Sequence, residues 1–406
     1  MNRPAHTPLR PMKSAWIVIV CAATIVTLAM GARQSFGLFL PQMSMALDIG
    51  RSSFGLAIAI QNLVFGLAQP FVGALADRHG AGRVAAGGAL LYAAGLTAAA
   101  YAGSAIGMHL SLGVLVGLAM AGCTFTVTLG AVGRVVPMHK RTMAFGIVTA
   151  GGSLGQFLVV PGAQMMLADY GYHISLIALA GLVAIGAVLA IGIAGHPGGE
   201  QDHAEQSAGE ALREALGQRS YLLLNAGYFV CGFQLAFIGT HFPAYLNDHG
   251  LGTMIGATAL ALIGLFNIFG SYAFGVSGDH FRKHHVLAGL YVARAVAILI
   301  FLALPLSNAS AMVFASVMGF LWLGTVPLTN GLVGQIFGVR HLSMLGGLVF
   351  MSHQIGSFFG AWLAGIAYDA SGSYNFAWGA SIVLSLFAAL VHLPIRDAPL
   401  MRAQPA

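Results

Sequence analysis

Charged side chains are scarce in this sequence of 406 residues. Asp, Glu, Lys and Arg together make up 7% of it, whereas 58% of the residues are hydrophobic. Soluble domains carry roughly a quarter charged residues, so this composition excludes a soluble globular protein. Twelve apolar runs lie between charged or Pro-, Gly- and Asn-rich breaks. Each is long enough for the roughly 20 helical residues that cross a bilayer, so we predict an all-α membrane protein with twelve transmembrane helices.

Cysteine is also rare. Its three copies, Cys21, Cys123 and Cys231, all fall inside predicted spans, which excludes a disulfide framework or a metal site built on cysteine. The sequence contains no HExxH, no GxSxG and no Cys/His ligand spacing, and its glycine pairs follow no strand. We therefore expect no enzymatic activity, no cofactor and no metal.

Acidic residues are missing from the middle of every predicted span, because all twelve lie at loops or helix ends. Proton-driven drug exporters and sugar symporters usually keep a carboxylate inside the membrane as a proton relay. The sequence therefore disfavours that coupling scheme. The side chains that remain in the lipid zone are cationic or neutral.

Basic residues, by contrast, are present and unequally distributed between alternate loops. Cytoplasmic loops accumulate Lys and Arg, and placing the N terminus inside leaves only Arg51 outside. We expect a multi-pass protein of the inner (plasma) membrane with both termini in the cytoplasm. The net charge of +6 then reflects topology and needs no nucleic-acid partner. The residues predicted to be cytoplasmic are Arg3, Arg10, Lys13, Arg78, Arg83, Arg134, Lys140, Arg141, Arg213, Arg219, Arg282, Lys283, Arg340, Arg396 and Arg402.

Two segments of the chain are near copies of each other. The stretch GALADRHGAGR at 73–83 returns as GVSGDHFRKH at 275–284, an offset of 202 residues (279 minus 77). The same offset pairs Pro41 with Pro243, so the repeat extends over several helices.

A long polar stretch lies between the two copies. With six spans before it, both halves start on the same side, and the repeats are parallel. We predict an N-terminal six-helix bundle at 1–195, a cytoplasmic linker at 196–219 and a C-terminal six-helix bundle at 220–406. A pseudo-two-fold axis along the membrane normal would relate the bundles.

The duplicated segment resembles the signature loop of the major facilitator superfamily. The first copy is close to the family pattern, and the second has His280 in place of the first arginine. The resemblance implies two bundles that rock around a central site, with Asp77 and Asp279 latching cytoplasmic helix ends against partner helices. The predicted gating residues are Gly73, Asp77, Arg78, Gly80, Arg83, Asp279 and Arg282.

Within that superfamily the chain is most similar to monocarboxylate and oxalate/formate carriers. The similarity lies in GARQSFGLF at 31–39, KRTMAFGIVTAG at 140–151 and GTHFPAYL at 239–246. In those carriers the cation in span 1 helps to hold the substrate carboxylate, and that position is Arg33 here. Such carriers often have an arginine in span 8, which this chain lacks. Oxalate/formate exchangers carry a lysine in span 11, where this chain has His353.

Arg33 stands alone in a stretch too long for one straight crossing, so we expect helix 1 to tilt and bury it in the outer half of the membrane. An arginine at a helix centre costs about 2.5 to 3.5 kcal/mol on insertion scales, and no acidic residue in the spans can pair with it. A bound anion can, because guanidinium matches a carboxylate in bidentate geometry. Snorkelling to the outer interface is the alternative.

Three other ionisable side chains lie within spans. Arg294 either contacts substrate or ties span 9 to backbone carbonyls. His353 and His241 either bind the anion or a proton, or only make structural hydrogen bonds. Together with neutral polar neighbours they complete the predicted substrate site, which is Arg33, Gln34, Gln156, Gln234, His241, Asn267, Arg294, Trp322 and His353.

These observations predict a monomeric secondary transporter of small organic carboxylates that works by rocker-switch alternating access. Without a membrane carboxylate, it would either exchange a counter-anion or carry protons with the substrate. Two alternatives remain. One is an exporter of drugs or neutral metabolites in which Arg33 is structural. The other is a membrane sensor that binds an anion and signals through the linker.

Overall fold

The computed structural model describes residues 15–49, 51–195, 206–251 and 253–400. These ranges are helical, with no strand, and contain twelve helical segments long and apolar enough to cross a membrane. The predicted all-α fold is therefore confirmed. The first ten linker residues, 196–205, lie outside the described residues, as do Arg3, Arg10, Lys13 and Arg402, so the linker boundaries and the topology stay predictions.

The N-terminal bundle contains spans 1 to 6. Its elements are α1 (Ala15–Gln34), α2 (Phe36–Ala46), α3 (Arg51–His79), α4 (Ala81–Ala100), α5 (Ala105–Met108), the π-helix η1 (His109–Leu115), α6 (Val116–Cys123), α7 (Phe125–Val135) and α8 (Met138–Leu189). The long α8 carries spans 5 and 6 and leaves helical geometry at Gly171, where φ is 73°. Glycine tolerates this left-handed conformation without steric cost.

The C-terminal bundle contains spans 7 to 12. After the short helix α9 (Ala208–Gly217) come α10 (Arg219–Asp248), α11 (Thr253–His280), α12 (Lys283–Ala303), α13 (Asn308–Phe320), α14 (Thr325–Phe337), α15 (Leu342–Ser371) and α16 (Asn375–His392). Spans 4 and 10 are both interrupted near their middle, at Thr124 and at 321–324. The two interruptions lie at similar but not identical repeat positions, because the 202-residue offset places Thr124 opposite Val326, two residues after the break in span 10.

The first span is also interrupted, which differs from the single tilted helix expected. Ser35 separates α1 from α2. Its Oγ donates to the Gly31 carbonyl at 3.0 Å, and the backbone bonds around it shorten to an i to i−3 pattern, from Ser35 to Ala32 and from Leu38 to Ser35. A serine that bonds back to the preceding turn competes with regular helix geometry. Arg33 consequently lies in the last turn of α1.

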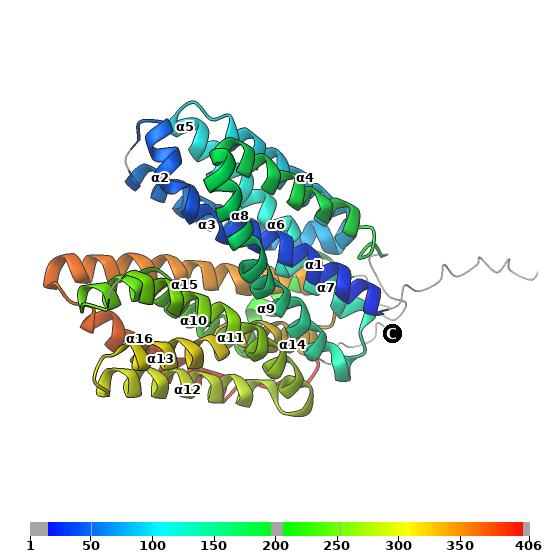
Figure 1. The fold of residues 1–406 in the computed structure, drawn as a ribbon. Helices are drawn as coiled ribbons and strands as arrows, with labels where there is room; N and C mark the ends of the chain where they lie inside the picture. The colour runs from blue at the N-terminus through cyan, green and yellow to red at the C-terminus, as the bar shows by residue number, and fades with distance from the viewer. Residues whose placement is uncertain (1–14, 50, 196–205, 252, 401–406) are drawn as a thin grey trace, which may run out of the picture.

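The two bundles lie side by side and approach each other most closely at one end. Figure 1 shows the ends of α1, α7 and α14 gathered at one end of the molecule, whereas α2 and α5 lie at the opposite end, away from the C-terminal bundle. We call the first of these the latch end, because Asp77 and Asp279 lie there. Each bundle has its own packing, with α8 against α1 and α4 in one and α15 against α10 in the other.

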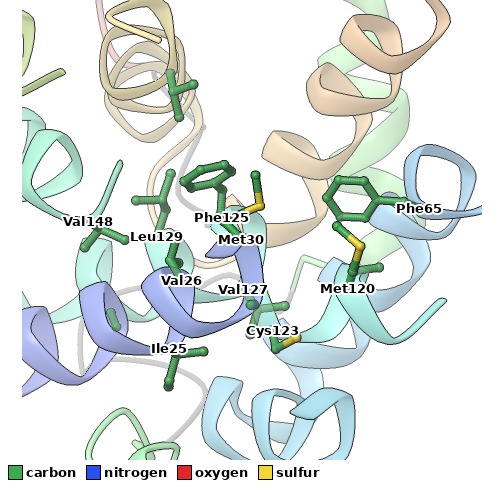
Figure 2. Close-up of a cluster of buried hydrophobic side chains, with 14 of the residues drawn as sticks. Ile25, Val26, Met30, Phe65, Met120, Cys123, Phe125, Val127, Leu129 and Val148 are labelled. Atoms are coloured by element: carbon green, nitrogen blue, oxygen red, sulfur yellow. The ribbon is translucent and has the colours of Figure 1, made fainter. Parts of the chain in front are cut away.

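The interior of each bundle is apolar, and the two interiors differ. In the N-terminal bundle, side chains of α1, α6 and α7 meet, with Phe125 beside Met30 (Figure 2). In the C-terminal bundle the core is aromatic. Phe301 stacks on Phe314 with ring centroids 4.3 Å apart, and Trp378 lies edge-on to Phe237 with centroids 4.8 Å apart. Because lipid is as apolar as these side chains, close packing rather than burial stabilises the bundles.

Two helix pairs make the most extensive contacts between the bundles, and α7 with α15 and α8 with α14 make smaller ones. We call the two extensive pairs the α3–α15 seam and the α8–α11 seam. Glycines allow both: a Cβ at Gly347 would lie 2.6 Å from the Gln69 carbonyl, and one at Gly146 would lie 2.6 Å from the Ser271 carbonyl. Any larger residue would force the helices apart at these points.

Candidate substrate site between the bundles

Arg33 projects from the last turn of α1 toward α3. Its Nη2 donates to Asn62 Oδ1 at 2.5 Å, and its guanidinium lies 5.8 Å from the centroid of the Phe65 ring. Arg134 pairs with Asp77 and His284 with Asp397, and neither ion pair involves Arg33. The half-buried guanidinium is thus held by an amide and a ring, with its charge not neutralised by a carboxylate.

A chain of contacts leads from Arg33 across the α3–α15 seam to His353. The backbone carbonyl of Asn62 accepts from Gln354 Nε2 at 3.4 Å. Gln354 Oε1 in turn accepts from His353 Nδ1 at 3.1 Å. Phe350 stacks on His353 at 5.4 Å and meets Phe65 edge-on at 5.2 Å. The single cation of span 1 and the histidine of span 11 therefore belong to one cluster.

His353 keeps one nitrogen unused in this cluster. The residue is 7% exposed, and its Nε2 has no partner of hydrogen-bond geometry among the described residues, although the Cys231 thiol lies close enough to act as a hydrogen-bond partner of the ring. The neighbouring Tyr228, 5.0 Å away ring to ring, has an equally unpartnered Oη. Buried polar groups left unpaired cost about 1 to 3 kcal/mol each, so they call for an explanation.

The next residue of α1, Gln34, turns toward the other seam. Its Nε2 donates to Gln156 Oε1 of α8 at 3.3 Å. Ser153 lies one helical turn before Gln156 on α8, and its Oγ accepts from Asn267 Nδ2 of α11 at 2.6 Å. Asn267 Oδ1 accepts from the backbone N–H of Leu323 at 2.9 Å. The last turn of α1 thus touches both seams. Asn267 also fixes the interrupted part of span 10, where the half-buried Trp322 lies.

Three predicted site residues lie elsewhere, within the C-terminal bundle. Arg294 is fully buried and donates to the carbonyls of Leu321 and Trp322 and to Gln234 Oε1. Gln234 also donates to the Ser381 carbonyl at 2.9 Å. His241 bonds the Ala361 carbonyl from Nε2 and Tyr374 Oη from Nδ1. In this conformation all three satisfy hydrogen bonds inside one bundle.

At the latch end each signature aspartate meets the partner bundle. Asp77 accepts from the backbone N–H of Ser343 at 3.3 Å and of Met344 at 2.8 Å, in the first turn of α15, and it pairs with Arg134. Asp279 accepts from the N–H of Thr142 at 2.9 Å and of Met143 at 2.8 Å, near the start of α8. A carboxylate at a helix start is favoured by the exposed N–H groups and the helix dipole.

The glycines of the signature loop have steric reasons. Gly80 has φ 94° and begins α4, a conformation that other residues rarely adopt. A Cβ at Gly73 would overlap the Ser343 carbonyl. Arg78, Arg83 and Arg282, which complete the predicted gating set, have exposed side chains in this structure.

Comparison with known proteins agrees with this architecture. The family model described as Major Facilitator Superfamily matches residues 22–332, which is well over half of the chain. The chain belongs to the Major Facilitator Superfamily. It is 28% identical to monocarboxylate transporter 13 of Bos taurus over 395 residues, covering 93% of this chain and 89% of that one. It is 25% identical to the uncharacterized MFS-type transporter YhjX of Escherichia coli (strain K12), covering 86% and 88%.

Solved structures of the superfamily share the fold. A variant of the Escherichia coli fucose:proton symporter FucP superposes with a TM-score of 0.75 at 16% identity, covering 94% of this chain and 98% of that one. The proton:xylose symporter XylE bound to 6-bromo-6-deoxy-D-glucose superposes with a TM-score of 0.72 at 13% identity, covering 93% and 94%. At these identities the comparison concerns the arrangement of helices alone.

The cluster around Arg33 contains polar side chains that the sequence did not single out. Asn62 and Gln354, which connect Arg33 to His353, were not among the predicted site residues. One signal could have found Gln354: it lies 201 residues after Ser153 (354 minus 153), so both seams carry a polar side chain at the same repeat position. Phe65, Phe350 and Tyr228 give no such signal, because aromatic residues are common in every span.

Proposed function

We propose that this protein is a secondary active transporter of small organic carboxylate anions, of the monocarboxylate or oxalate/formate type. The single observation that carries the proposal is Arg33, a membrane cation held by Asn62 and Phe65 without a carboxylate partner. An uncompensated guanidinium in the membrane is expensive, and an anion that binds it in bidentate geometry removes much of that cost. The names of the monocarboxylate relatives support the same substrate class.

The second side of the site would come from the C-terminal bundle. His353 is the titratable side chain of that bundle that belongs to the Arg33 cluster, and its Nε2 has no partner of hydrogen-bond geometry among the described residues. Gln34, Gln156, Asn267 and Trp322 would shape the space between the seams. Gln234, Arg294 and His241 are satisfied inside their bundle here, and direct contact with substrate would need them to rearrange.

The latch end would be the cytoplasmic side. This follows from the predicted topology, in which Lys and Arg collect at that side. Both latches are closed in this structure, so it would represent the state that is closed to the cytoplasm. Transport would proceed by a rocking motion that parts the two seams and opens the opposite side of the molecule. Coupling would be either exchange against another anion or cotransport of a proton.

The test is uptake of labelled lactate, formate and oxalate into vesicles that contain the purified protein, with and without an unlabelled anion inside. We expect Arg33→Gln to lower kcat/KM for uptake at least about tenfold, mainly by raising KM. The reason is that a hydrogen bond to a charged group contributes about 1.5 to 3 kcal/mol. Arg33→Lys, which keeps the charge but loses the fork geometry, should fall between. Arg213→Gln, which removes an exposed charge from α9, is the matched control and should transport normally.

Two outcomes would contradict the proposal. Normal carboxylate uptake by Arg33→Gln would show that the guanidinium is structural. Absence of carboxylate flux in the wild type, with resistance of expressing cells to unrelated toxins, would instead identify an exporter of drugs or neutral metabolites. A dye that reports internal pH separates the two coupling modes, since only proton cotransport acidifies the vesicles during uptake.

A further inference from the structure

Gln69 occupies the middle of the α3–α15 seam. Five residues of α3 at helical spacing face α15: Asn62, Gly66, Gln69, Gly73 and Asp77. The contacts of four of them with α15 are direct, through the Gln354 side chain for the first two and the Ser343 and Met344 backbone for the last two. Gln69 lies between these contacts, with its own carbonyl against Gly347.

The amide of Gln69 is buried and unpaired. Its side chain is 0% exposed, and neither Nε2 nor Oε1 has a hydrogen-bond partner among the described residues. Both ends of the same amide are therefore unsatisfied at a tight contact between the bundles. Native proteins contain few such groups, and each one carries a free-energy cost in the state that buries it.

The other seam is different at the corresponding position. The 202-residue offset pairs Gln69 with Ser271, whose Oγ donates to Asn267 Oδ1 at 3.1 Å. Asn267 then bonds Ser153 across the seam. At this repeat position the α8–α11 seam thus satisfies its polar side chains when closed, whereas the α3–α15 seam leaves Gln69 unpaired. Elsewhere along the α8–α11 seam, the buried Thr142 Oγ1 has no partner among the described residues.

We propose that Gln69 sets the balance of the transport cycle by penalising the state in which the latch end is closed. When the bundles part at that end, the amide gains water, or a carboxylate oxygen on its way out, as partner. The buried amide thereby offsets part of the stabilisation that the Asp77 latch gives to the closed state. Without this offset the closed state would be too favourable for rapid turnover. This inference rests on alternating access from the proposed function, but not on the identity of the substrate.

Substitutions of opposite character at this position separate the proposal from a simple packing role. Gln69→Met has similar volume and no polar atoms, so it should stabilise the closed seam. Gln69→Glu introduces a charge that is costly to bury and should open the seam. If Gln69 only packed between helices, both variants would loosen the seam.

Hydrogen–deuterium exchange of the full-length protein in nanodiscs, without substrate, measures the equilibrium directly. The N–H groups of Ser343 and Met344 are protected by Asp77 when the latch end is closed. We expect about tenfold slower exchange in peptides containing them for Gln69→Met and faster exchange for Gln69→Glu. As the matched control, Ser153→Ala removes a satisfied cross-seam bond and should speed exchange at Thr142 and Met143.

Transport provides the second measurement, using whichever substrate the wild type carries. Gln69→Met should lower kcat with little change in the KM for substrate outside the vesicle, since the substitution does not touch Arg33. Faster or unchanged exchange at 343–344 in Gln69→Met would overturn the inference, whether or not carboxylates are substrates. If that variant does not fold, Gln69→Leu replaces it with the same expected sign. If the exchange rates of Gln69→Met and Gln69→Glu change as expected but the wild type takes up no carboxylate, only the proposed substrate class would be overturned.

Discussion

The two arginines inside the spans have the same charge but different surroundings. Arg294 gives its donors to the carbonyls of Leu321 and Trp322, which fall in the interruption between α13 and α14, and to Gln234. Carbonyls at a helix end in the membrane have no water to bond, so Arg294 completes the backbone of span 10. Arg33 by contrast bonds the amide of Asn62 and lies over Phe65, whose ring meets Phe350 across the α3–α15 seam. Arg294 thus serves the fold, whereas Arg33 keeps an uncompensated charge, which the proposed function assigns to a ligand.

This difference predicts opposite phenotypes for the two positions. Arg294→Gln should lower the free energy of unfolding by about 3 kcal/mol or more, because several hydrogen bonds to a charged group are lost at once. Arg33→Gln should leave thermal stability unchanged or raised, since it removes an uncompensated charge. Thermal denaturation of the two purified variants in the same detergent checks this. Equal destabilisation by both would show that Arg33 is also structural.

Sequence alone could single out Arg33 and Arg294 because membrane cations are few, but it could not tell their roles apart. That distinction depends on where span 10 is interrupted, and no proline or charge marks positions 321–324. Gln234 illustrates the same limit. Its helical spacing to His241 is visible in the sequence, yet its partners, Ser381 and Ser385, lie about 150 residues away.

Among the elements, the helix α9 begins with a local side-chain network that lies outside the predicted spans. Ser207 Oγ accepts from the Glu210 N–H at 3.2 Å, and the Glu210 carboxylate accepts from the Ser207 N–H at 2.7 Å. This is a capping box, in which each side chain satisfies one free N–H of the helix start. Ala211 and Ala215 bury their side chains, so the cap positions α9 at the start of the C-terminal bundle.

The cap predicts that α9 is sensitive to acid. The hydrogen bonds from Ser207 hold the pKa of the fully exposed Glu210 below its ordinary value. A lowered pKa in the folded state means that this stabilisation is complete above the ordinary glutamate pKa of about 4.3 and is lost as the pH falls through the folded value. The protection factors of the amides of residues 208–217 should therefore fall in that acidic range. An unfolded peptide of the same sequence, measured at each pH, supplies the intrinsic exchange rate.

Glu210→Gln is the control for this prediction. Glutamine can accept the same hydrogen bond from Ser207 but does not titrate, so the pH dependence of protection should disappear while the cap remains. If protection of the variant fell with pH as it does in the wild type, a different group would be responsible.

At the scale of the whole molecule, the repeat predicts the scaffold well and the site poorly. Asp77 and Asp279 occupy equivalent positions and make equivalent contacts, as their duplication in the sequence leads one to expect. Positions near the site are instead unlike their repeats: His353 lies 201 residues after Gly152 (353 minus 152). Gly152 leaves space for Phe125, which a histidine ring would fill. Where the two repeats carry different residues, as at His353 and Gly152, the contacts of one bundle do not predict those of the other.

The latches are also unequal, and this leads to the last prediction. Asp77 pairs with Arg134 in addition to the α15 backbone, whereas Asp279 makes no ion pair within 4 Å among the described residues and has Arg141 and Lys283 only within electrostatic range. Asp77→Asn removes a carboxylate and also leaves Arg134 without its partner, so it should open the latch end more than Asp279→Asn does.

In the proposed rocking motion the two bundles part as rigid units, so opening would break both latches at once. The costs of the two substitutions should therefore add as free energies, and the open population of the double variant should rise multiplicatively. Spin labels at His79→Cys and Phe281→Cys, two exposed positions on opposite bundles at the latch end, report the separation. The long-distance population should increase from wild type through Asp279→Asn and Asp77→Asn to the double variant. A double variant no more open than Asp77→Asn would mean that the α3–α15 seam opens independently, and that the bundles do not move as rigid units.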